Sequence, residues 1–172
     1  MTKLSRIKNL SLALGCAALA FTTNSISAAD IRVNAGTTWT LAPTADPSVF
    51  THTVDGITQV SLLGNCTFHA DVLVRFPAKA GHPLALAGSA IFMAADGTTL
   101  KAALVGEGTP DPASARFLNF HYRATFNGGS GPLANARGEG DINGAALFVT
   151  ELSGKATWKL KGHIEGINNP KK

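Results

Sequence analysis

Residues 126–140, the most informative stretch of the sequence, read Phe-Asn-Gly-Gly-Ser-Gly-Pro-Leu-Ala-Asn-Ala-Arg-Gly-Glu-Gly. It joins an expected strand at 117–126 to another at 136–142 through a loop rich in glycine. Because glycine tolerates positive φ and close backbone approach, the loop is predicted to need a special conformation. The alternate glycines Gly138 and Gly140 indicate a tight bend or a close strand contact, as at a barrel corner. The stretch specifies structure and contains no recognisable reaction chemistry.

Apolar and polar residues alternate with period two on both sides of this loop. In residues 66–76 one face carries the apolar series Cys66, Phe68, Ala70, Val72, Val74 and Phe76. The opposite face carries Thr67, His69, Asp71, Leu73 and Arg75. The same pattern places Leu118, Phe120, Tyr122, Ala124 and Phe126 on one face, and Ala156, Trp158, Leu160, Gly162 and Ile164 on another. This period is typical of half-buried strands.

Turn signals divide the remaining sequence into further strands. Asp96-Gly97 predicts a hairpin between 84–95 and 98–105, and Asp55-Gly56 predicts a second one between 49–54 and 57–63. Further short strands are expected at 37–41 and 145–152. Since no segment has helical apolar spacing, we expect an all-β chain: a single soluble antiparallel barrel of eight, and up to ten, strands. Closure is favoured because it removes exposed strand edges.

The glycine-rich loop also carries a family resemblance. Its order Phe126, Gly128-Gly129-Ser130-Gly131-Pro132-Leu133, Ala136 and Gly138 resembles a motif of the allene oxide cyclase barrel superfamily, which includes dirigent proteins. Residues 64–67, 95–100 and 154–164 add matches, most of all to uncharacterised secreted bacterial members. Ser130, Pro132 and Leu133 stand where the family usually has Thr, Arg and Phe. The resemblance covers about the last two-thirds of the chain and implies an eight-stranded antiparallel barrel. It implies no activity, because the matching positions are turn and packing residues.

The N-terminal region reads as a signal for export. Three basic residues precede an apolar run at 10–21, and Ser25-Ile26-Ser27-Ala28-Ala29 offers small residues for cleavage after Ala28 or Ala29. The run is shorter than the about 20 residues that span a bilayer. A lipoprotein signal ending at Cys16 fits less well, because it would divide the apolar region. We therefore expect a signal peptide at 1–29, a barrel domain at 30–167 and a flexible tail at 168–172. Export would be to the periplasm or the medium of a bacterial cell.

Charge and cysteine content narrow the function classes. Residues 1–29 hold three of the fifteen basic residues and none of the eleven acidic ones, so the remainder is almost neutral. We expect no nucleic-acid partner, because no strand carries a basic run with interleaved aromatic residues. Cys66 is then a lone cysteine without an internal partner, and its place in an apolar series favours a buried thiol over a nucleophile.

Polar side chains gather in rows that allow two interpretations. The rows are His69 with Asp71, His121 with Arg123, the series Arg137, Glu139 and Asp141, and the series Lys159, Lys161 and His163. Inside the barrel they could form an acid–base site, whereas outside they would form its solvated face, which the patterning favours. The five histidines, His52 among them, have no metal-ligand spacing. We therefore expect neither a metal nor another cofactor.

Aromatic residues on the apolar faces are the candidates for a ligand cavity. Phe68, Phe120, Tyr122 and Trp158 could line a pocket for an apolar molecule, since an eight-stranded barrel can hold one ligand. The alternative, that they only fill the core, is favoured because neighbouring inner positions are often Ala or Gly. Catalytic residues cannot be assigned.

Three functions stay open. The first is non-catalytic binding of a small apolar molecule or a protein partner by an exported barrel, and it is the one we expect. The second is a cyclase or isomerase acting on a hydrophobic molecule in the cavity, which would need an ionisable group facing that cavity. The third is an outer-membrane barrel, whose alternation would be inverted, with polar residues inside and apolar residues outside. Oligomeric state has no signal in the sequence.

Overall fold

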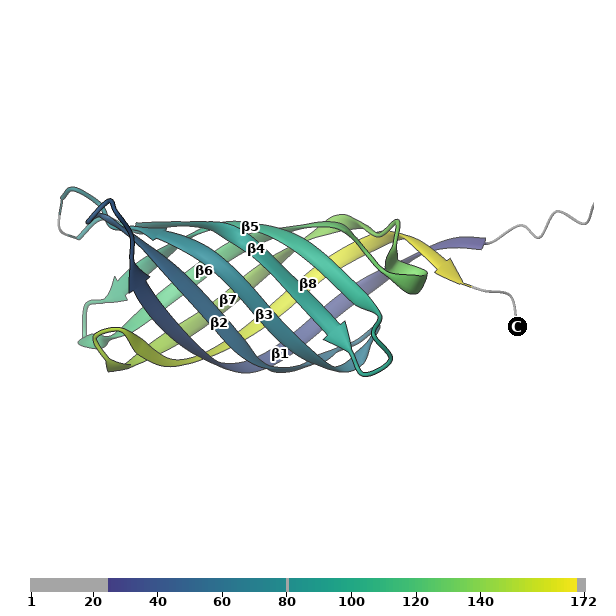
Figure 1. Ribbon diagram of the computed structural model, residues 1–172, viewed down its shortest axis with the longest axis horizontal. Coiled ribbons are helices and arrows are strands. Elements are labelled where there is room, and N and C mark those ends of the chain that lie inside the picture. The colour runs from purple at the N-terminus through teal and green to yellow at the C-terminus, as the bar shows by residue number, and fades with distance from the viewer. Residues whose placement is uncertain (1–24, 80, 170–172) are drawn as a thin grey trace, which may run out of the picture.

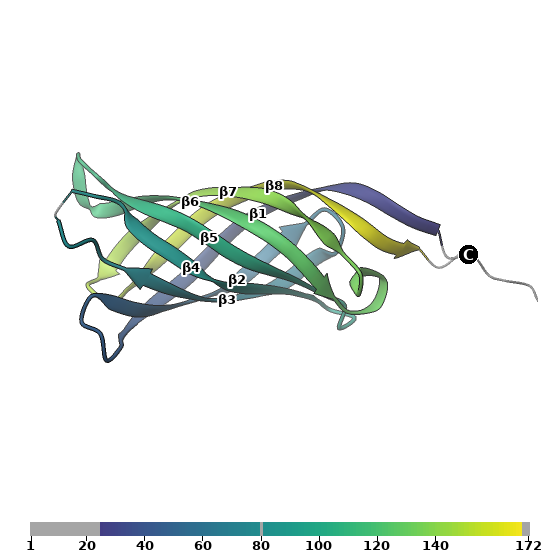
Figure 2. The same cartoon turned by 90° about the horizontal axis from the view of Figure 1, so that it is seen from above.

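The chain folds into one closed barrel of eight antiparallel strands, each paired with its neighbours along the chain (Figures 1 and 2). The computed structural model describes residues 25–79 and 81–169. The strands are β1 (Ser25–Pro43), β2 (Val49–Val60), β3 (Gly64–Arg75), β4 (Leu84–Ala94), β5 (Thr99–Asp111), β6 (Ser114–Gly129), β7 (Arg137–Thr150) and β8 (Ser153–Asn169). A 3-10 turn, η1 (Gly131–Leu133), follows β6. The expected fold class, an all-β eight-stranded antiparallel barrel, is confirmed.

The predicted alternation separates the inside of the barrel from the outside. In β3 the side chains of Cys66, Phe68, Ala70, Val72 and Val74 are buried, and those between them are exposed. The faces assigned to 118–126 and 156–164 also point inward. Phe76 is an exception, because it follows the end of β3 and is 43% exposed. Its ring instead packs edge-on against Phe50, with centroids 5.4 Å apart.

Two expected strand breaks are wrong. Asp55-Gly56 is not a turn, because β2 runs through it and pairs Gly56 with both Thr37 and Phe68. A Cβ on Gly56 would lie 2.9 Å from the carbonyl oxygen of Gly36, so this glycine permits close strand approach. The expected strands 136–142 and 145–152 are likewise parts of one strand, β7. The hairpin at Asp96-Gly97 is confirmed, with Gly97 at φ 83°.

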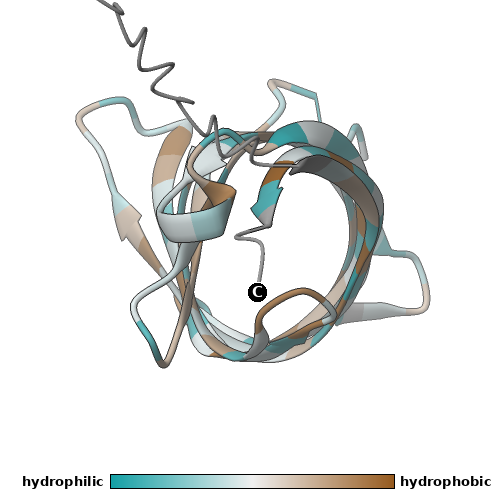
Figure 3. Ribbon diagram, turned by 90° about the vertical axis from the view of Figure 1, so that its right-hand side faces the viewer, coloured by the Kyte–Doolittle hydropathy of each residue, from teal (hydrophilic) through white to brown (hydrophobic). Residues whose placement is uncertain are grey.

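The glycine-rich loop lies at one end of the barrel. Gly128, Gly131 and Gly138 all have positive φ, which confirms the predicted special conformation. The Ser130 hydroxyl accepts a hydrogen bond from the Thr99 amide at 2.9 Å. It also donates one to the Gly97 carbonyl at 3.2 Å, so the loop is tied to the neighbouring β4–β5 turn. Leu133 and Ala136 are thereby held in the core. The loop lies at the end of the barrel that faces the viewer in Figure 3.

The first and last strands meet along most of their length. β1 pairs with β8 from Ser25 opposite Asn169 to Thr40 opposite Ser153, with an irregularity between Ser27 and Ala29. Most of the expected signal peptide and the last three residues lie outside the described residues. Residues 25–29 form the beginning of β1, and 168–169 form the end of β8.

The outer surface carries the polar rows. Arg123 pairs with Glu139, the His121 Nε2 atom lies 3.5 Å from Asp141 Oδ1, and His69 contacts Asp55 and Asp71 at 2.8 and 3.2 Å. The expected solvated face is therefore confirmed. This arrangement is the reverse of the apolar outer band that an outer-membrane barrel requires. Among residues 25–79 and 81–169, no helix has the length and apolar character needed to span a membrane.

The close contact at Gly138 gives a first testable prediction. A Cβ on Gly138, which has φ 144°, would lie 2.0 Å from the backbone oxygen of His163, whereas one on Gly36 would meet nothing within 4 Å. Gly138→Ala should therefore lower the free energy of unfolding by about 3 kcal/mol. Gly36→Ala should change it by less than about 0.5 kcal/mol. Guanidinium unfolding of both variants checks this, and equal stabilities would contradict the proposed contact.

Candidate functional site

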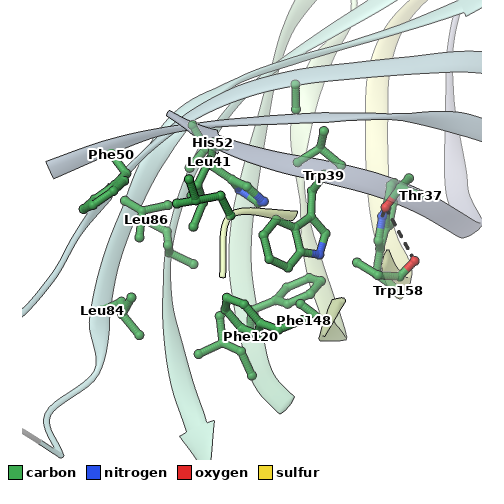
Figure 4. Close-up of a pocket in the computed structure, with 18 of the residues that line it drawn as sticks. Thr37, Trp39, Leu41, Phe50, His52, Leu84, Leu86, Phe120, Phe148 and Trp158 are labelled. Atoms are coloured by element: carbon green, nitrogen blue, oxygen red, sulfur yellow. Dashed lines mark hydrogen bonds between the residues drawn. The ribbon is translucent and has the colours of Figure 1, made fainter. Parts of the chain in front are cut away.

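A large cavity opens at the end of the barrel opposite the glycine-rich loop. Its volume is about 780 Å³, and it enters the barrel between the turns that follow β1, β3, β5 and β7 (Figure 4). Three of the inward side chains along its wall are alanines, Ala70, Ala146 and Ala156. Because these side chains are small, the space beside them stays open. In the other half of the barrel, larger side chains occupy the corresponding space. The opposite end is not solid either, because a second pocket of about 650 Å³ lies there beside Leu133, Pro132 and Ile167.

Two aromatic rings, Phe68 and Trp158, form the floor of the cavity, and Phe92 supports them from behind. Phe68 lies 4.9 Å from Trp158 and 5.0 Å from Phe92, measured between ring centroids, and Phe92 is almost fully buried. The Trp158 indole donates a hydrogen bond to the Thr37 hydroxyl at 3.3 Å, which fixes the orientation of its ring. The floor is therefore rigid and apolar, with its one indole N–H already paired.

One side of the wall combines aromatic rings with polar nitrogens. Trp39 packs edge-on against Phe148 at 4.8 Å and against the His52 imidazole at 5.5 Å, between centroids. Trp39 and His52 come from neighbouring strands, β1 and β2, and both side chains point inward (Figure 4). Among the described residues, neither the Trp39 Nε1 atom nor the His52 Nδ1 atom has a hydrogen-bond partner.

His52 is a neutral histidine at physiological pH. Burial lowers the pKa of its imidazole from 6.5 to about 4, because a charged ring would lose its hydration there. The Nδ1 atom is shielded and has no hydrogen-bond partner. A proton on this atom would make it an unsatisfied buried donor, which lowers the stability of the folded state. The tautomer that carries the proton on Nε2 is therefore favoured, and it leaves the ring an N–H to donate.

Tyr122 adds a hydroxyl to the opposite side of the cavity. Its side chain is buried beside Phe120, with ring centroids 5.7 Å apart. Burial raises the pKa of the phenol, so the hydroxyl stays protonated and neutral. It can donate or accept a hydrogen bond but cannot supply a charge.

Charged groups are confined to the mouth of the cavity. The Arg116 guanidinium lies there and donates from Nε and Nη2 to the carbonyl oxygen of Phe148, at 3.3 and 3.2 Å. Glu151 lies on the same rim. The deeper lining is uncharged, and its residues are largely aromatic and aliphatic.

The four residues expected to line a cavity all do so. Phe68, Phe120, Tyr122 and Trp158 are part of its lining, while their role in ligand binding stays a prediction. The favoured alternative, that inward residues only fill the core, describes the large buried side chains near the loop that contains Gly128, Gly129, Gly131, Ala136 and Gly138. Trp39 and His52 also line the cavity, and neither was predicted to do so from the sequence. The alternation of Phe50, His52 and Val54 within the predicted strand 49–54 is the local signal that places His52 on the inner face.

The other candidate groups lie outside the cavity. His69, His121 and His163 are on the outer surface, and the described residues contain no group of three or more His, Cys, Asp or Glu able to hold a metal. Cys66 is a free, buried cysteine, as expected. Burial, with a smaller effect of the Asp96 carboxylate, raises the pKa of its thiol, which disfavours the nucleophilic thiolate.

Comparison with known proteins adds little to this picture. The sequence matches no protein-family model and no curated protein. Among solved structures, the pterocarpan synthase dirigent protein is similar at 10% sequence identity, with a TM-score of 0.42 over 92% of this chain and 100% of that chain. A superposition of this quality says nothing about the chemistry of the cavity.

The buried imidazole should make stability depend on pH. The unfolded chain binds a proton at His52 near pH 6.5 and the folded one near pH 4, so the folded state loses stability as the pH falls between them. From pH 7.5 to 4.5 the native protein should lose about 2 kcal/mol more than the His52→Leu variant. Urea unfolding at both pH values measures this, because all other titrating groups are common to the two proteins. Parallel losses would show that His52 is solvated.

Proposed function

We propose that the chain is a non-catalytic binding protein that takes a small apolar molecule into the open end of its barrel. The observation that carries the proposal is the apolar cavity of about 780 Å³ with an aromatic floor and uncharged walls. Sites for small molecules commonly have this size and contain few polar groups among apolar ones. We further propose that it is a secreted member of the allene oxide cyclase barrel superfamily, on the resemblance of residues 126–138.

The polar groups of the wall restrict the ligand. A neutral imidazole and a phenol hydroxyl can hydrogen-bond to a ligand, but they offer no charge partner inside the barrel, and the Trp39 N–H is shielded from the cavity. Burying an ion among them would be costly. The favoured ligand is therefore an uncharged molecule with an apolar body and one or two oxygen atoms that accept hydrogen bonds.

A cyclase or isomerase is the second candidate, because His52 is an ionisable group facing the cavity. A general base works best when its pKa is near the working pH, and a pKa of about 4 makes His52 a weak base at neutral pH. Binding is therefore favoured over catalysis. Recovery of a bound lipid-extract component at unchanged mass but altered chromatographic retention would identify an isomerase instead.

Binding of a neutral fluorescent probe tests the cavity directly. N-phenyl-1-naphthylamine should bind the purified protein at one saturable site. Ala146→Phe should weaken this binding at least about tenfold, because the new ring would point into the cavity and occupy part of it. A fluorescence titration of native and variant proteins gives the measurement.

The matched control is Ala42→Phe, which adds the same ring to an exposed position of β1. It should leave probe affinity unchanged. Uptake that never saturates, or equal effects of the two substitutions, would rule out the cavity as the binding site.

Export with removal of the N-terminal segment is the second part of the proposal. Cleavage after Ala28 falls at the irregularity of the β1–β8 pairing, between Ser27 and Ala29. It would remove only the pairs beyond that irregularity and would leave the register from Ala29 to Thr40 intact. The proposed cleavage is thus compatible with a closed barrel.

Intact-mass measurement of the protein made in a bacterial host tests this part. The expected product begins at Ala29 or Asp30 and is recovered from the periplasm or the medium. A full-length product retained in the cytoplasm would contradict export. A lipid-modified product beginning at Cys16 would instead favour the lipoprotein alternative.

A further inference from the structure

The outer face of β4 differs from the rest of the barrel surface. Its outward residues are Ala85, Ala87, Ser89, Ile91 and Met93, none of them charged. Each of the other seven described strands carries at least one charged or titratable residue outward: Arg32, Asp55, His69, Lys101, Arg123, Glu139 and Lys155. Leu73 of β3 and Val105 of β5 flank β4 and are 52% and 65% exposed. We call these seven apolar and hydroxyl residues, together with Ala103, the β4 patch.

The sizes of the side chains flatten part of the β4 patch. A barrel wall is convex, so β4 forms a ridge between β3 and β5. At Ala87 the ridge side chain is small, whereas Leu73 and Val105, both paired in register with Ala87, lie on the slopes. This produces a more level surface in that half of the patch, which suits contact with another flat surface, while Ile91 and Met93 project from the ridge further along β4.

The register across the three strands shows what could cover this surface. Arg75, Ala85 and Glu107 lie at one level, and Leu73, Ala87 and Val105 lie at the next. A two-fold axis parallel to β4 places β3 of one copy over β5 of the other at the same level. Arg75 of each copy then faces Glu107 of the other, and Leu73 faces Val105.

The remaining levels are compatible with the same arrangement. Asp71 is level with Ala103, and His69 is level with Lys101, one step further along. The His69 imidazole is already held between Asp55 and Asp71, so carboxylates lie close to the approaching lysine. Thr67 and Thr99 share the last level with Met93. The levels of Arg75 with Glu107 and of Leu73 with Val105 are thus self-complementary, as an interface with two-fold symmetry requires.

We propose that two copies of this chain associate through the β4 patch about a two-fold axis parallel to β4. A patch from Ala85 to Met93 is about 27 Å long at the usual strand rise, so the interface is at the small end of specific contacts. The dimer is therefore a weak one that forms reversibly with rising concentration. This inference is independent of the proposed ligand, because the patch faces away from the barrel interior.

Sedimentation velocity of the full protein as recovered from cells tests the proposal. The expected result is a monomer–dimer equilibrium over about 1–500 μM protein, a range suited to a small interface. Val105→Lys should raise the dissociation constant at least about tenfold by burying an unpaired charge. Ile57→Lys is the matched control, because Ile57 is 72% exposed on β2, outside the patch. A monomer at every concentration, or equal effects of both variants, overturns the proposal.

Charge reversal tests whether Arg75 of one copy faces Glu107 of the other. Arg75→Glu and Glu107→Arg should each weaken association, and the double variant should restore it to near the native value. Arg75 also contacts Asp46 in its own chain at 3.4 Å, so loss from Arg75→Glu alone does not identify the partner, whereas rescue by Glu107→Arg does. Failure of the rescue overturns the two-fold arrangement. Flotation with phosphatidylglycerol vesicles that is lost in Val105→Lys would assign the patch to a lipid surface and also overturn the proposal.

Discussion

The hydrogen-bonded pairing of β1 with β8 closes the sheet into a barrel, and the core and the cavity both follow from that closure. An open sheet of eight strands would expose two edges and two faces, whereas this pairing removes the edges and creates an inside. Closure places one face of every strand inside the barrel. The apolar residues of the alternating pattern, such as Val33 and Leu160, are therefore buried. The long register, from Ser25 to Thr40, holds the two ends of the chain together along the barrel wall (Figure 1).

Side-chain volume, rather than the course of the backbone, distinguishes the half of the barrel nearer the glycine-rich loop from the half that holds the large cavity. In the first half Ile31, Leu100, Phe126 and Ile164 are almost completely buried, and Leu133 is added from the loop. In the second half the lining includes alanines, and the space is bounded by rings rather than filled by them. An eight-stranded barrel has just enough interior for its own side chains, so a run of small ones leaves room for a ligand.

The sequence predicts the strands and their inward faces well, because alternation is a local signal. The same dipeptide predicts a turn at Asp96-Gly97 and at Asp55-Gly56. The first prediction is confirmed, whereas the second is wrong because β2 continues through it. The difference is tertiary: Gly56 lies beneath the backbone of Gly36 and Thr37, and only the assembled barrel shows that contact. The cavity depends on volumes summed over several strands, so no local pattern reveals it. His52 shares the inward series of Phe50 and Val54, yet its isolation from other charged groups is visible only in three dimensions.

The union of the first and last strands also affects how the chain reaches its native state. A β1 segment made early must wait for β8, more than a hundred residues later, before its second edge is satisfied. Contacts so distant in sequence are slow to form, and a strand edge left open in the meantime can pair with other chains. Translocation as an unfolded chain would suit such a protein, since the barrel is completed only when the last strand has arrived.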